Sequence, residues 1–133
     1  MEKIAPFVLI LVLIAVALLS ELFTGQETDW KRGRVYHRLV CTSCHIESIG
    51  EAISPMDKTI AEWTDYYEAG KHGGTSETGD LAFYVSEPYR QSIAHYNLAA
   101  EKYMDLTAQQ LQADVLAFAV RGAKDSDTPM RCQ

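Results

Sequence analysis

The sequence predicts an all-α domain that follows one long apolar amino-terminal segment. Apolar side chains recur at spacings of three and four residues in several segments, and these segments are bounded by helix-capping residues or glycine. No stretch alternates apolar and polar residues convincingly enough to predict a strand. The chain has 133 residues, 47% of them hydrophobic and 23% charged, which is typical of one small globular domain.

The amino-terminal segment is long enough to cross a membrane. Residues 4–19 contain no charged side chain, and the apolar character resumes after Glu21 and ends at Phe23. A signal peptide has an apolar region of about 7 to 15 residues, whereas a membrane span needs about 17 to 25. Residues 1–23 are therefore predicted to be a transmembrane anchor or uncleaved signal, with a cleaved signal peptide as the alternative. Lys3 and the α-amino group favour a cytoplasmic amino end, which places the rest of the chain outside the cytoplasm.

The domain itself is predicted to span residues 24–122 and to contain four helices. The first covers residues 30–40, where Val35, Leu39 and Val40 form an apolar side. The opposite side of this helix carries four basic residues, which are Lys31, Arg32, Arg34 and Arg38.

The second predicted helix has Asp57 as its N-cap, Ile60, Trp63 and Tyr67 on one face, and Gly70 as its stop. Its apolar spacing is that of a helix packed against a core.

The third and fourth helices complete the predicted domain. The third runs from Pro88, a favoured first-turn residue, to Met104. The fourth begins at Thr107, which forms a capping box with Gln110, and ends at Gly122. Its buried stripe consists of Leu111, Val115 and Phe118. Residues 123–133 are polar and turn-prone and are treated as a polar carboxy-terminal tail.

Residues 41–45 form a complete C-x-x-C-H pattern, which is the pattern of covalent haem attachment. At this spacing the thiols of Cys41 and Cys44 reach the two vinyl groups of one porphyrin, while the imidazole of His45 reaches the iron. A redox disulfide and a zinc site are the alternatives. The first normally follows a strand in a βαβ unit, and the second usually needs four ligands. The remaining cysteine, Cys132, stands alone and is assigned no role.

Around this motif the sequence resembles the cytochrome c family, and in particular the small single-haem proteins built like class I cytochromes. The resemblance covers residues 34–122. It implies a cytochrome c-like helical fold around one covalently bound haem c, with His45 as the proximal iron ligand. It also implies that the carbonyl of Pro55 accepts a hydrogen bond from the ring of His45, which would orient that ring. The last helix resembles the family's carboxy-terminal helix, which crosses the amino-terminal helix beside the haem.

The ligand on the second face of the iron is left open by the sequence. His72 is preferred because it is flanked by Gly70 and Gly73, which allow the backbone to bend freely. Its position after Trp63 is also similar to that of a second histidine in some single-haem members of the family. Met104 and His95 are the alternatives. Two other candidates, His37 and Met56, are expected to lie on the proximal side.

These features predict an electron carrier rather than an enzyme, anchored to the membrane with its haem domain in the periplasm or an equivalent extracytoplasmic space. The expected partners are the membrane and redox proteins, namely a quinol-oxidising complex and a downstream acceptor or reaction centre. Arg90 and Arg121 are expected to bind haem propionates or solvent. With 12 basic and 18 acidic residues the net charge is −6, which argues against nucleic-acid binding. The alternative function is a membrane-anchored haem sensor or gas-binding module with an open sixth coordination site, and a peroxidase-like enzyme comes third.

Overall fold

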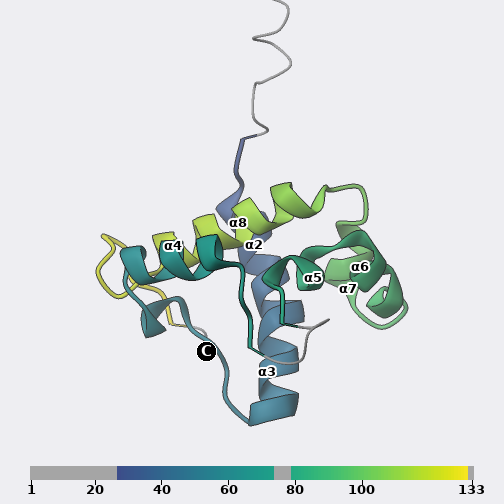
Figure 1. Ribbon diagram of the computed structural model, residues 1–133, viewed down its shortest axis with the longest axis horizontal. Helices are drawn as coiled ribbons and strands as arrows, with labels where there is room; N and C mark the ends of the chain where they lie inside the picture. The colour runs from purple at the N-terminus through teal and green to yellow at the C-terminus, as the bar shows by residue number, and fades with distance from the viewer. Residues whose placement is uncertain (1–26, 74–78, 132–133) are drawn as a thin grey trace, which may run out of the picture.

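A computed structural model describes residues 27–73 and 79–131. One helical run dominates it and consists of α2 (Trp30–Tyr36), the π-helical segment η1 (His37–Cys41) and α3 (Thr42–Ile49). Figure 1 shows this run with α8 (Ala108–Arg121) lying across it, α4 (Ile60–Ala69) on one side, and α5 (Leu81–Val85), α6 (Glu87–Ile93) and α7 (Leu98–Lys102) on the other. The described residues contain no named strand, only an isolated bridge between Lys71 and Asp80. The predicted all-α class is therefore confirmed.

The first helical run begins at a side-chain cap and continues through the cysteine motif. The Asp29 carboxylate accepts hydrogen bonds from the backbone N–H groups of Lys31 and Arg32. The run ends at Gly50, whose φ of 74° is the left-handed conformation that glycine adopts most readily. The prediction of a helix that ended at residue 40 was too short. Because the whole motif is helical, Cys41, Cys44 and His45 lie three and four residues apart on one face.

The helix at residues 60–69 was predicted correctly, but its cap was not. Thr59 is the N-cap of α4, and its side chain forms a capping box with Glu62. Asp57 instead ends the short 3-10 helix η2 (Pro55–Asp57), which Ser54 caps. Gly70 has a φ of 65° and follows α4 directly, as predicted.

The predicted helix from Pro88 to Met104 is two helices. Asn97 lies between α6 and α7, and its side chain accepts hydrogen bonds from the backbone of Ala99 and Ala100. A side chain that caps a new helix competes with continuation of the preceding one. The amide of Asn97 also donates to the carbonyl of Leu39 at 2.6 Å, so this break is tied to the first helical run. Helix α5, which Asp80 caps, was not predicted.

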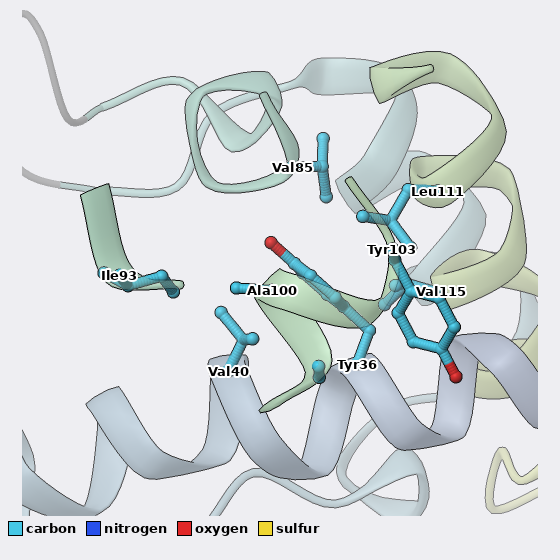
Figure 2. Close-up of a cluster of buried hydrophobic side chains, with 9 residues drawn as sticks. Tyr36, Val40, Val85, Ile93, Ala100, Tyr103, Leu111 and Val115 are labelled. Atoms are coloured by element: carbon cyan, nitrogen blue, oxygen red, sulfur yellow. The ribbon is translucent and has the colours of Figure 1, made fainter. Parts of the chain in front are cut away.

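The core lies where the first helical run, α5 to α7 and α8 meet (Figure 2). Tyr36 is completely buried there, and its hydroxyl donates to the carbonyl of Tyr84 at 2.6 Å, which satisfies its one polar group. The other buried side chains of this cluster are Val40, Val85, Ile93, Ala99, Ala100, Tyr103, Leu111 and Val115. A smaller cluster joins Trp63 of α4 to Ala119 and Ala123.

The predicted tail is attached to the domain as far as the structure describes it. Met130 donates its backbone N–H to Gly122, and its carbonyl accepts from the Ser54 hydroxyl at 3.2 Å. Lys124 donates its backbone N–H to the carbonyl of Lys58. Residues 123–131 therefore close over η2 rather than extending away from it.

Among the described residues, no helix is long and apolar enough to cross a membrane. The predicted anchor, residues 1–23, lies outside the described residues, so that prediction is untested.

Helices α2 and α8 cross at Gly33, and this crossing provides a prediction. A Cβ atom at this position would lie 2.8 Å from the backbone nitrogen of Val115 and would overlap the carbonyl oxygen of Asp114. In an open helix Gly→Ala stabilises by roughly 0.5–1 kcal/mol. We expect Gly33→Ala to destabilise instead, by about 1–3 kcal/mol, because two backbones must separate.

Urea denaturation of this variant measures the effect, with Arg34→Ala as the control on the same helix. Arg34 is exposed, so its replacement should change the free energy of unfolding by less than about 0.5 kcal/mol. A stabilised Gly33→Ala protein would contradict the close crossing.

Candidate functional site

The site is an apolar cavity of about 240 Å³ beside the cysteine motif. Cys41, Cys44 and His45 line it from η1 and α3, and His72 lines it from the loop after α4. The apolar and aromatic lining comes from Val40, Tyr67, Leu81, Tyr84, Val85, Tyr89 and Val115. A more open groove of about 390 Å³ shares Val40, Cys44 and Tyr89 with the cavity. The site therefore combines two thiols and two imidazoles with largely apolar walls.

The two histidines face each other across a short distance. Their ring centroids are 5.6 Å apart and their planes are inclined by 65°. Two imidazoles at this separation are close enough to bind one metal ion between them.

The position of His72 is determined by its loop and by two tyrosines. Its backbone N–H donates to the carbonyl of Gly79 at 2.8 Å, next to the bridge between Lys71 and Asp80. The Tyr66 hydroxyl lies 2.5 Å from Nδ1 of His72, and the Tyr84 ring lies 4.7 Å away, centroid to centroid. When Nδ1–H donates to Tyr66, Nε2 keeps its lone pair for a metal.

Burial and the nearby His45 lower the pKa of His72, in that order of size. Both effects favour the neutral ring, which is the form that binds metals.

On the side of the cavity that carries His45, the structure differs from the prediction in one hydrogen bond. Nδ1 of His45 is buried without a hydrogen-bond partner. The carbonyl of Pro55, predicted to accept from this ring, instead accepts from the indole N–H of Trp63 at 2.7 Å. Among the described residues, the predicted bond from His45 to Pro55 is therefore absent.

The Cys41 thiol lies in an apolar environment that disfavours its ionised form. Burial raises the pKa of Cys41 to about 12. The attacking thiol of a disulfide-exchange pair has a lowered pKa and lies near positive charge, so Cys41 does not fit that role, whereas Cys44 is exposed. The described residues contain no group of three or more His, Cys, Asp or Glu side chains arranged to hold a metal ion. Cys132 lies outside the described residues.

The other ligand candidates do not line the cavity. His95 is exposed, with its ring against that of Tyr96. Met104 lies in the turn between α7 and α8, and Met56 lies in η2. His37 is buried, and its ring contacts that of Phe118. Of the residues considered for the second face of the iron, only His72 lines the cavity with His45.

Sequence reasoning missed the role of Tyr66 and misassigned Arg90. Tyr66 holds the ring of His72, a contact that depends on the turn at Gly70 and has no signal in the sequence. Arg90 is completely buried, and its guanidinium donates to the carbonyls of Tyr103 and Leu106. It therefore supports the turn before α8 and is not available to bind propionates or solvent.

His37 predicts a pH dependence of stability. Burial, assisted by the nearby His45, lowers the pKa of His37 to about 4 from its ordinary value of 6.5. The unfolded chain therefore binds more protons between these pH values, and stability falls as the pH decreases through this window. The contribution of His37 is a loss of about 2 kcal/mol between pH 7 and pH 5.

Urea denaturation of wild type and His37→Gln at the two pH values measures this loss. The variant should lose less stability than wild type by about that amount. An equal change of the unfolding free energy with pH in wild type and His37→Gln would show that burial does not hold His37 neutral.

Comparisons with known proteins identify no relative. A scan against models of protein families found no match, and searches of curated proteins and of solved structures found none either.

Proposed function

We propose that this protein is a membrane-anchored, single-haem c-type cytochrome, similar in fold to class I cytochromes, that carries electrons outside the cytoplasm. The observation that carries the proposal is the placement of the C-x-x-C-H motif and His72 around one apolar cavity. The crossing of α2 and α8 beside this cavity also supports it, since the resemblance implies such a crossing. The expected redox partners are a quinol-oxidising complex and a downstream acceptor or reaction centre.

The residues of the cavity suit a covalently bound haem. The rings of His45 and His72 lie 5.6 Å apart, centroid to centroid, so both could reach one iron atom between them. Among the described residues, the buried Nδ1 of His45 has no hydrogen-bond partner, so only packing holds this ring in place. Cys41 and Cys44 lie on the same helix face as His45 and would supply the two thioether bonds.

One-electron chemistry is supplied by the haem iron when the group is bound. The protein's part is to bind, to orient and to exclude water. His45 and His72 would hold the iron, and two histidine ligands generally give a lower potential than histidine with methionine. Val85, Leu81 and Val115 keep the cavity apolar, and Tyr66 orients His72. If His45 and His72 both hold the iron, the site would suit electron transfer rather than gas binding.

Absorption spectra of the full chain test this proposal. We expect a low-spin, six-coordinate reduced form that does not bind carbon monoxide. His72→Ala should become high-spin and bind carbon monoxide, because it loses one axial ligand. His95→Ala is the matched control and should keep the wild-type spectrum, as should Met104→Leu.

Two outcomes would contradict the proposal. A wild-type protein that binds carbon monoxide would favour the sensor or gas-binding alternative. An unchanged low-spin spectrum in His72→Ala would remove His72 as the ligand.

A further inference from the structure

A second groove lies on the first helical run, away from the two histidines. Its volume is about 550 Å³, and it is lined by residues of α2 and η1. The lining residues are Trp30, Lys31, Arg34, Val35, Arg38 and Leu39. Three of them are cations and three are apolar, and no acidic residue is among them.

The cations of this groove are available for a ligand. Lys31, Arg34 and Arg38 are exposed, and within residues 27–73 and 79–131 none of them forms an ion pair. Arg32, on the same helix, differs because it is paired with the buried Asp114. A cationic groove is unusual in a chain whose net charge is −6. It therefore favours an anionic ligand.

The groove also has an apolar part. Trp30 and Val35 are half-buried, and Leu39 is 43% exposed. The guanidinium of Arg121 lies 4.6 Å from the centre of the Trp30 ring, so the end of α8 adds a fourth cation beside the indole. Tryptophan with basic neighbours is typical of residues at the membrane–water interface.

We propose that this groove binds the headgroup of an anionic phospholipid, with the cations on the phosphate and with Trp30, Val35 and Leu39 against the first methylene groups of the acyl chains. Six residues separate Phe23, the end of the apolar amino-terminal segment, from Trp30. Even fully extended, that connection spans at most about 25 Å. A soluble acidic protein would match the cations but would leave the apolar part of the groove unused. The proposal does not depend on haem binding.

The test measures the rate at which a lysine-acylating reagent modifies Lys31 of the full chain, by mass spectrometry. The protein is mixed with vesicles of phosphatidylcholine alone, or with vesicles in which part of the lipid is phosphatidylglycerol. We expect Lys31 to be modified several-fold more slowly with the anionic vesicles. Lys71 and Lys102, which are exposed and lie outside the groove, should react equally with both and serve as internal controls.

The variant arm removes two cations from the groove. Each basic residue near an anionic surface strengthens the attraction about fivefold, so Arg34→Gln with Arg38→Gln should abolish most of the protection of Lys31. The matched control, Lys71→Gln with Lys102→Gln, makes the same change in net charge and should keep it.

Three results would overturn the proposal. The first is modification of Lys31 at equal rates with both vesicles, and the second is equal protection of Lys31 and Lys102. The third is equal protection of Lys31 by inorganic phosphate or by polyglutamate without anionic lipid, which would assign the groove to free phosphate or to an acidic protein.

Discussion

Replacing both Cys41 and Cys44 by alanine is expected to give a protein that retains no haem after extraction with acidified acetone. Both thiols lie beside His45 on one helix face, and each would carry one thioether bond. Either single variant keeps one such bond and should retain part of the haem. Intact-protein mass spectrometry measures the fraction of each protein that carries the added mass of one haem. This fraction should be largest for wild type, smaller for the single variants and zero for the double variant.

The control for this experiment is Cys132→Ala, which removes the third cysteine of the chain and should leave the added mass unchanged. A wild-type protein with only the mass of its polypeptide would refute the proposed function. A double variant that still carries haem covalently would show that the attachment is elsewhere.

The double variant should also be less stable than wild type. Without a bound group, the cavity leaves Val85, Leu81 and Val115 facing an open apolar space. Atoms that line an open space lose the contacts they would make with a filled interior. We expect its thermal unfolding to occur at a lower temperature than that of Cys132→Ala, measured by circular dichroism.

Asp114→Ala is expected to destabilise the protein by about 3 kcal/mol, because it removes two hydrogen bonds to a charged carboxylate, each worth roughly 1.5–3 kcal/mol. The side chain of Asp114 is completely buried where α8 crosses α2. It accepts from the Arg32 guanidinium and, at 2.7 Å, from the backbone N–H of Asp29. Its removal leaves both donors without their acceptor and weakens the start of the first helical run.

The matched control is Glu62→Gln, which alters the ion pair between Glu62 and Lys124. The side chains of that pair are 55% and 45% exposed, and exposed pairs contribute less than about 1 kcal/mol. Urea denaturation of both variants gives the comparison. Equal losses of stability would show that the pair at the helix crossing has no special role.

Helix limits were predictable where local side chains decide them. Gly70 ends α4, and Thr107 caps α8, because a glycine stop and a capping hydroxyl act within one turn of the chain. The break at Asn97 was missed, although asparagine is a favoured N-cap. Apolar spacing on both sides of it suggested one continuous helix, whereas its side chain caps α7 and bonds to Leu39.

The residue types of the candidate site could be predicted from the sequence, but the arrangement of their side chains was harder to predict. The spacing of Cys41, Cys44 and His45 is a local property of one helix. The arrangement around Pro55 depends on where Trp63 lies after folding. Its indole donates to the Pro55 carbonyl, whereas Nδ1 of His45 has no hydrogen-bond partner among the described residues.

The order of residues alone determined the helical class and the motif at residues 41–45, because both follow from spacing within a few turns. It also provided a short list of candidates for the second iron ligand. Tertiary structure decided which member of that set faces His45. His72 does so because the turn at Gly70, the bond to Gly79 and the hydroxyl of Tyr66 bring its ring there. His95, in the turn after α6, is left facing solvent. The flanking glycines favoured His72 in the sequence, but contacts between residues distant along the chain set the position of its ring.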